Sequence, residues 1–234
     1  MQGLFGFLRF SCFPIGASVA LFVQACKEPP LPAGDSPAQS LDSQVQASVE
    51  ELPPLNQHQK DACKLCHSNR EMQRGPVLDG MEGWYVLAQL EKFKSGQRGI
   101  DPSNRAELLM ASALKDIEGE LALRQYADYI AGLPPQQSLT TVKGDKGRGE
   151  TLYAKCANCH GADARGKPEM KAPGLLVQED WFLLDQLRKY KLGLRGAHPK
   201  DAFGVLMAAS VKSWPDKDLK DIVAYLDSLG KPIP

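Results

Sequence analysis

The chain has 234 residues, with 28 basic and 28 acidic side chains and a formal net charge of zero. This balance disfavours both a highly basic nucleic-acid-binding protein and an acidic, disordered one. Hydrophobic residues make up 43% of the chain and charged residues 24%, as in ordinary soluble globular proteins, and the length allows one large domain or two of about a hundred residues.

Residues 1–25 resemble a bacterial export signal of the lipoprotein type. A single basic residue, Arg9, precedes an apolar run over residues 10–23, and small residues lie near the expected cleavage point. Residues 23–26 (VQAC) resemble a lipoprotein signal, although Gln24 is not the usual residue at its position, and Cys26 would become the acylated first residue of the mature protein. Plain cleavage and an uncleaved anchor are the alternatives, and all three place the folded part outside the cytoplasm.

Residues 26–55 predict a flexible tether. The segment is rich in Pro, Ser, Ala and Gln and has no aromatic residue. It therefore cannot bury enough apolar surface to offset the entropy lost on ordering. An arm packed loosely across the domains is the alternative.

The rest of the sequence consists of two copies of one repeat. The motif CxxCH at residues 63–67 recurs at 156–160, and further matches follow at an offset of 97, at which Trp84 aligns with Trp181. Two such copies indicate two homologous domains rather than a solenoid. The expected boundaries are 56–134 for the first domain, 135–142 for the linker and 143–234 for the second domain.

Helical patterns dominate both copies. In each copy a short helix would carry CxxCH, a second would cover residues 84–94 or 181–191, and a third would close the domain. The closing helices have apolar residues at helical spacing, and strand-like alternation is nearly absent. These apolar residues are Leu123, Tyr126, Ala127, Ile130 and Leu133 in the first copy and Leu219, Ile222, Val223, Leu226 and Leu229 in the second. The expected fold class is all-α, with two tandem domains.

The cysteines indicate the chemistry. Paired CxxCH motifs are typical of c-type haem attachment, in which two thiols bond the porphyrin and the adjacent histidine binds iron. The thiols would be those of Cys63, Cys66, Cys156 and Cys159, and the histidines His67 and His160. Disulfides, a structural zinc site and a thioredoxin-like pair are disfavoured, the zinc site because the two pairs are 156 − 66 = 90 residues apart. We expect two covalently bound haem c groups.

A sixth iron ligand is expected downstream of each histidine. The candidates are Met72, Met81, Met110, Met170, His198 and Met207. Only Met110 and Met207 align with one another, both within Leu-Met-Ala. A methionine on an apolar segment more often packs than ligates, but its recurrence favours ligation. Histidine and methionine together fill the coordination of iron and raise its reduction potential, which favours electron transfer over catalysis.

The motif set resembles class I dihaem cytochromes c of the cytochrome c4 type. The features that carry this resemblance are CxxCH, a following proline, a Gln-Leu helix before Gly-x-Arg, a methionine and an amphipathic closing helix. The resemblance implies that the carbonyls of Pro76 and Pro173 accept hydrogen bonds from Nδ1–H of His67 and His160. It also implies stacked domains with the haem propionates near the interface. Ser68 departs from the family pattern, which has glycine after CxxCH.

The expected function is electron transport in a respiratory chain on the periplasmic side of a membrane. A carrier, rather than an enzyme, would take electrons from a quinol-oxidising complex or a dehydrogenase and pass them to a terminal oxidase or reductase. A cytochrome subunit of a larger periplasmic oxidoreductase is the alternative, and a dihaem peroxidase is disfavoured by the two methionines. The expected partners are redox proteins and, through a lipid anchor, the membrane, with no nucleic acid.

Charge differs between the two copies. Residues 56–134 carry 10 basic and 11 acidic side chains (net −1), whereas residues 143–234 carry 16 and 12 (net +4). Basic side chains close together in the second copy are Arg188, Lys189, Lys191, Arg195 and Lys200. They indicate either a positive patch that steers an acidic redox partner or an ordinary solvated helix face.

Overall fold

The structure is a computed structural model and describes residues 52–68, 73–137 and 139–230. The expected export signal, the acylated Cys26 and most of the expected tether lie outside the described residues. Within those ranges, no helix is long and apolar enough to cross a lipid bilayer.

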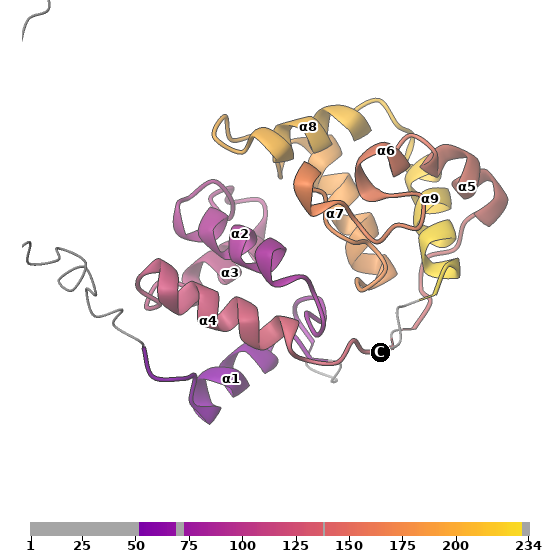
Figure 1. The fold of residues 1–234 in the computed structure, drawn as a ribbon. Helices are drawn as coiled ribbons and strands as arrows, with labels where there is room; N and C mark the ends of the chain where they lie inside the picture. The colour runs from indigo at the N-terminus through magenta and orange to yellow at the C-terminus, as the bar shows by residue number, and fades with distance from the viewer. Residues whose placement is uncertain (1–51, 69–72, 138, 231–234) are drawn as a thin grey trace, which may run out of the picture. The chain divides into compact units, whose positions relative to one another are not determined.

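The first half of the described chain forms a group of helices (Figure 1) that share one apolar core. Its helices are α1 (Gln57–Lys64), α2 (Gly83–Lys94), α3 (Arg105–Ala113) and α4 (Glu120–Ala131). Helix α1 begins at a capping box, in which the side chains of Asn56 and Gln59 each accept the other's backbone N–H. Helices α2 and α4 pack against one another and bury Val86, Leu90 and Ile130 between them.

The second half forms another helical group. Its elements are α5 (Lys146–Tyr153), α6 (Ala157–His160), the 3₁₀ helix η2 (Pro168–Met170), α7 (Asp180–Leu192), α8 (Ala202–Val211) and α9 (Asp216–Ser228). Helix α9 packs against both α5 and α7. The closest approach to α5 is at Gly149, where an added Cβ would lie 2.0 Å from the carbonyl oxygen of Asp221. Glycine is therefore required where α5 crosses α9.

The all-α prediction is confirmed. Over the described residues, β pairing is limited to one isolated bridge between Lys167 and Ala172. The apolar stripes of the closing helices face the cores as expected, apart from their last members. Leu133 and Leu229 lie beyond the ends of α4 and α9, and Leu229 is 41% exposed.

Helices α3 and α8 were not among the predicted elements. Each carries one of the two recurring methionines, and α8 reads AFGVLMAASV. A helix with apolar residues on every side lacks the polar contrast on which periodicity depends. The sequence therefore predicted the two methionines as candidate ligands but did not predict the helices on which they lie.

Candidate haem-binding sites

Each CxxCH histidine points one ring nitrogen at a proline carbonyl. Nδ1 of His67 lies 2.8 Å from the carbonyl oxygen of Pro76, and Nδ1 of His160 lies 2.9 Å from that of Pro173. Since a carbonyl can only accept, Nδ1 carries the proton in both rings. The lone pair of Nε2 is thereby left available to a metal in each half.

Burial favours the neutral form of both histidine rings. Burial lowers the pKa of His67, and the bond to Pro76 offsets this only in part. Burial likewise lowers the pKa of His160, against the raising effects of the Pro173 bond and of the nearby Glu82 carboxylate. Neutral imidazole is the form that binds a transition metal.

Glycines allow close backbone approach around these histidines. A Cβ on Gly75 would lie 2.5 Å from Cε1 of His67, so only glycine leaves the ring in its place. Gly161, directly after the second CxxCH, has a φ of 81°, which favours glycine. Ser68, at the corresponding position of the first copy, is not among the described residues with positive φ. The turn after CxxCH therefore differs between the two halves, which accounts for the serine.

No disulfide joins the four motif cysteines to one another. Cys66 and Cys159 are exposed, whereas Cys63 and Cys156 are half-buried, and burial raises the pKa of Cys63 and raises that of Cys156 to about 11. In the part of the chain that the structure describes, no three His, Cys, Asp or Glu side chains come together as a metal-binding group. The zinc and disulfide alternatives therefore have no support among these residues.

The candidate methionines fall into different surroundings. Met81 is buried in the core of the first half, and Met170 is 44% exposed on η2. Met110 on α3 and Met207 on α8 are half-buried on equivalent helices, each packed against the edge of its own core. Met72 lies outside the described residues.

His198, the remaining candidate ligand, is engaged locally. Its Nδ1 accepts a hydrogen bond from the backbone N–H of Lys200 at 3.2 Å. The side chain is half-buried in the loop before α8. Of the candidates within the described residues, only Met110 and Met207 therefore occupy matching places in the two halves.

The residues around both motifs fit a c-type haem. Apolar side chains on the methionine helices are exposed in the protein alone, among them Leu109 at 55% and Leu206 at 64%. Four buried donors have no acceptor among the described residues, namely Nε1 of Trp84, Nε of Arg98, Nδ2 of Asn104 and Nε2 of Gln178. An apolar porphyrin ring with two carboxylates offers cover to such apolar groups and acceptors to such donors.

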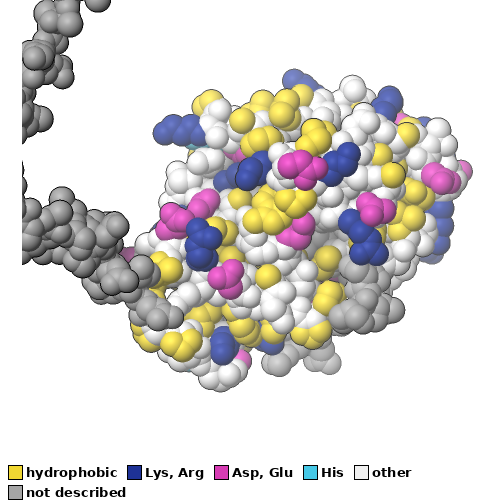
Figure 2. Space-filling view, viewed as in Figure 1, with side chains coloured by type: hydrophobic (Ala, Val, Ile, Leu, Met, Phe, Trp, Pro, Cys, Tyr) yellow, Lys and Arg dark blue, Asp and Glu magenta, His cyan; other side chains and the backbone are white. Residues whose placement is uncertain are grey.

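The basic residues of the second half do not form a free patch. Arg195 is buried, whereas Arg188 and Lys189 pair with Asp216 and Asp185 at 2.6 and 2.7 Å. Figure 2 shows basic and acidic side chains interspersed with apolar ones over the visible face. Since Arg195 is buried and Arg188 and Lys189 are paired with acidic side chains, the five residues do not together form a positive steering patch.

Buried Arg195 belongs to a reciprocal contact between the two halves. Arg98 donates to Gln89 in its own half at 2.8 Å and to Gln186 in the other half at 2.9 Å. Arg195 donates to Gln186 at 2.7 Å and across to Gln89 at 3.0 Å. These are corresponding residues at the offset of 97, so the two halves meet with approximate two-fold symmetry.

This network departs from symmetry at two places. Arg98 also pairs with the buried carboxylate of Glu107 at 2.8 Å, whereas Arg195 also donates to the hydroxyl of Tyr85 at 2.8 Å. Burial alone would raise the pKa of Tyr85, but the charges of Arg195 and Arg98 outweigh it and lower the pKa below its ordinary value. Positive charge therefore dominates this buried junction.

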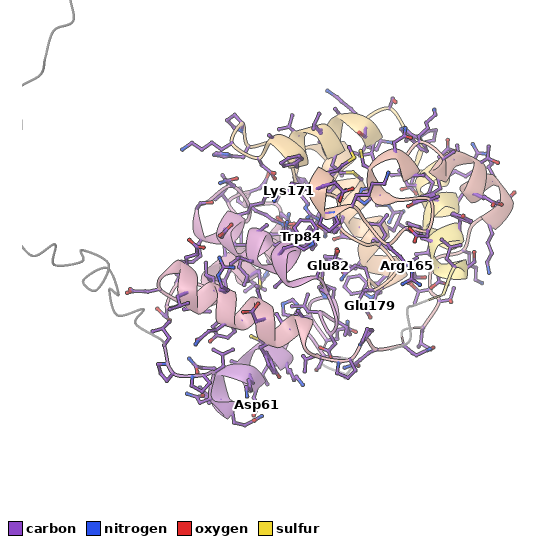
Figure 3. The ribbon with its side chains drawn as sticks, viewed as in Figure 1. Asp61, Glu82, Trp84, Arg165, Lys171 and Glu179 are labelled. Carbon is purple, nitrogen blue, oxygen red and sulfur yellow. The ribbon has the colours of Figure 1, made fainter. Side chains whose placement is uncertain are left out.

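A second reciprocal contact involves Glu82 and Glu179, which the sequence analysis did not single out. Oε2 of Glu179 accepts the backbone N–H of Val77 at 2.9 Å, and Oε2 of Glu82 accepts that of Gly174 at 2.8 Å. Figure 3 shows both glutamates where the two helical groups meet. Their alignment at an offset of 97 was the only signal in the sequence.

Comparisons with known proteins agree with this geometry. Residues 147–230 match the cytochrome c family. Cytochrome c4 of Azotobacter vinelandii is 23% identical over 71% of this chain and 84% of its own length. The thiosulfate dehydrogenase electron acceptor of Stutzerimonas stutzeri (strain A1501) is 25% identical over 73% of this chain and 80% of its own.

A solved structure shares the fold. The structure of cytochrome c4 from Acidithiobacillus ferrooxidans superposes with a TM-score of 0.58 at 22% identity and covers 72% of this chain and 99% of that one. The superposition therefore extends over both helical groups.

Proposed function

We propose that this chain, a c-type cytochrome with the dihaem fold of cytochrome c4, shuttles electrons between a periplasmic donor and a terminal oxidase or reductase. It is an electron carrier with two covalently bound haem c groups. The observation that carries the proposal is the repeated unit in which a neutral histidine after CxxCH is fixed by a proline carbonyl.

The proposed site residues are the same in both halves. Cys63 and Cys66 hold one haem through thioether bonds, and Cys156 and Cys159 hold the other. The iron of the first haem would be held by His67 and Met110, and that of the second by His160 and Met207. Pro76 and Pro173 orient the histidines by accepting their Nδ1–H protons.

The protein's own residues prepare the haems for electron transfer. Each haem iron supplies a one-electron couple, and a thioether ligand raises its potential relative to a second imidazole. The proline carbonyls fix the histidine tautomers, and the apolar cores of the two halves pack against Met110 and Met207. The domain boundaries are proposed to be 56–134 and 143–234, joined by residues 135–142.

The proposed location rests on the export-signal pattern of residues 1–26, and the proposed partners rest on the relatives. We propose that residues 1–25 direct export and that acylation of Cys26 holds the protein at the periplasmic face of a membrane, with residues 26–55 as the tether. Intact mass spectrometry of the membrane-extracted protein would show two haems and a lipid on a chain that begins at Cys26. A soluble product without the lipid would contradict the anchor.

A dehydrogenase is a second candidate donor. The relative from Stutzerimonas stutzeri is named as an electron acceptor of thiosulfate dehydrogenase. This chain would then act as the electron-transfer partner of a periplasmic dehydrogenase, with the same haem sites. Rapid-mixing reduction of the oxidised protein by a quinol-oxidising complex and by a dehydrogenase would distinguish the two donors.

The ligation is tested by replacing each proposed methionine ligand. We expect Met207→His to lower the midpoint potential of the second haem and to abolish its near-infrared methionine–iron band, because imidazole stabilises ferric iron better than a thioether does. Met110→His should do the same for the first haem. The measurement is a spectrally monitored redox titration.

Met170→His is the matched control for this test. Met170 is exposed on η2, so its replacement should leave both midpoints in place. Unchanged midpoints in Met110→His and Met207→His would show that the ligands are misassigned. A high-spin haem in the unaltered protein, with rapid turnover of hydrogen peroxide, would favour a peroxidase instead.

A further inference from the structure

A single peptide group links each proximal histidine to the opposite half of the molecule. The carbonyl of Pro76 and the N–H of Val77 belong to the same amide. Its oxygen lies 2.8 Å from Nδ1 of His67, and its N–H donates to Glu179 at 2.9 Å. A carboxylate of the second half therefore reaches the proximal histidine of the first half through one amide.

The same arrangement occurs in the opposite direction. The carbonyl of Pro173 lies 2.9 Å from Nδ1 of His160, and the N–H of the same amide, on Gly174, donates to Glu82 at 2.8 Å. Glu82 comes from the first half. The two series of contacts therefore correspond, and in each one the glutamate of one half binds the proline amide of the opposite half.

Neither glutamate caps its own helix. Glu82 and Glu179 occupy the N-cap positions of α2 and α7, where a side chain would ordinarily accept a backbone N–H of its own first turn. Neither side chain makes that bond. Both carboxylates are instead directed across the junction, where Glu179 is 6% exposed and also accepts a hydrogen bond from Gln73 at 2.8 Å.

A carboxylate on the N–H side of an amide changes the carbonyl on its other side. Charge-assisted hydrogen bonds are stronger than neutral ones, and consecutive hydrogen bonds polarise one another. The carbonyl oxygen becomes more negative and accepts Nδ1–H more strongly, which makes the imidazole a more basic ligand. A more basic ligand favours ferric over ferrous iron and lowers the midpoint potential.

We infer that Glu82 and Glu179 are crossed positioning residues, each of which lowers the potential of the haem held by the opposite half. This inference rests on the proposed ligation by His67 and His160. Each haem is thereby tuned by the domain to which it is not attached, so the contact between the halves sets both potentials.

The test uses the dihaem protein with Glu82→Gln and Glu179→Gln, singly and together. Glutamine keeps the size and an acceptor oxygen but removes the charge. We expect Glu82→Gln to favour reduction of the second haem by up to about tenfold, which is about 59 mV for one electron, with a much smaller change at the first. Glu179→Gln should favour reduction of the first haem. Redox titration followed by NMR of the haem methyl groups assigns each midpoint.

A second measurement distinguishes an electronic effect of the glutamate on the histidine from a purely structural role in holding the proline loop. The Nδ1–H proton of the proximal histidine and the amide proton of Val77 or Gly174 should both move upfield in the NMR spectrum when the charge is removed. If the glutamate only holds the loop, the chemical shift of the Nδ1–H proton should not change. That result would overturn the inference even if the domains loosened.

Asp180→Asn is the matched control. Asp180 is adjacent to Glu179 and is buried, but its carboxylate accepts the N–H groups of Thr141 and Val142 at 2.6 Å. Its replacement removes the same charge without touching either proline amide, so both midpoints should stay nearly fixed. Equal shifts of both haems in all three variants would show a general field effect and refute the crossed pathway.

Failure of the proposed function would look different. The unaltered protein is examined first for two low-spin haems with methionine–iron bands. If those are absent, the ligation on which the inference rests is wrong. If they are present and no midpoint follows the crossed pattern, only the role of the two glutamates is refuted.

Discussion

At the scale of single residues, small side chains shape the surroundings of the proposed iron ligands. His67 lies directly over Gly75, and the ring has no room to retreat because its Nδ1 is bound to the carbonyl of Pro76. The absence of a side chain at position 75 therefore helps to orient the His67 ring.

Gly75→Ala should disturb the first haem site selectively. The new Cβ would lie 2.5 Å from the His67 ring, so ring or loop must shift. Overpacking of this kind costs about 1–3 kcal/mol. Thermal unfolding should show this loss, and the first haem should shift its potential or lose its methionine–iron band.

Gly132→Ala serves as the comparison for that change. An added Cβ at Gly132 would meet its nearest neighbour at 3.5 Å, an ordinary contact, and its φ of −77° suits alanine. It should leave both haems unchanged. An equally undisturbed first haem in Gly75→Ala would show that the ring is not confined by this glycine.

At the scale of elements, α5 and α9 are joined by a buried carboxylate. Asp221 on α9 accepts hydrogen bonds from the backbone N–H of Asp145 and from Arg148 and Lys217. Burial alone would raise the pKa of Asp221, but these three donors outweigh it and lower the pKa to about 2. The ionised carboxylate therefore stabilises the crossing of the two helices.

This shift predicts an acid-dependent loss of stability. An unfolded aspartate has a pKa of about 3.9, so the unfolded chain takes up the proton first as pH falls. The stabilisation from Asp221 is complete above about pH 4 and is lost as pH falls towards about 2. The unfolding free energy, measured by denaturant titration at several pH values, should fall over this window.

The variant Asp221→Asn should be less stable at neutral pH and should show a shallower decline between about pH 4 and 2. Asp163→Asn provides the control, because that carboxylate is largely exposed. Matching slopes in the unaltered protein and in Asp221→Asn would contradict the assignment of this acid dependence to Asp221.

At the scale of the whole molecule, the two halves meet through buried guanidinium groups. Arg195 is 6% exposed, stacks on the ring of Tyr190 with 4.6 Å between guanidinium carbon and ring centre, and donates to Gln186, Gln89 and Tyr85. Two of these three acceptors, Gln89 and Tyr85, belong to the other half. This one side chain therefore binds both halves.

Arg195→Lys should weaken the contact between the halves. Lysine keeps the charge but lacks the planar fork that reaches several acceptors at once. Hydrogen bonds to charged groups contribute about 1.5–3 kcal/mol each, so we expect a loss of about 2 kcal/mol or more. Calorimetry should show a lower unfolding temperature or two separate transitions.

The comparison variant for this contact is Arg165→Lys, which alters an exposed arginine. It should unfold like the unaltered protein. If Arg195→Lys did the same, the buried network would contribute little to holding the halves together.

Local motifs could be predicted from the sequence, whereas contacts between the halves could not. CxxCH, the prolines and the recurring methionines occur in the same order in both copies, so alignment of the copies singles them out. Glu82 and Glu179 face a partner about a hundred residues away. Apart from the alignment of the two glutamates with one another, nothing in the sequence distinguishes such a carboxylate from a solvated one.

Arg195 illustrates the same limit of prediction from sequence. Within a run of basic residues it resembled part of a charged surface, yet it is buried because the opposite half supplies its acceptors. Helix α8 was missed for a related reason, since its apolar residues lack a polar face. When a distant part of the chain buries a residue, nothing in the sequence around that residue indicates its burial.

The reciprocity of the contacts has a consequence for ancestry. Arg98 meets Gln186 as Arg195 meets Gln89, which is the rule of an isologous contact between identical subunits. A chain that contains such a contact within itself is explained by duplication and fusion of a gene for a single-haem protein that already paired with itself. Later divergence, as at Glu107 and its counterpart Gly204, could then make two once-identical centres unequal.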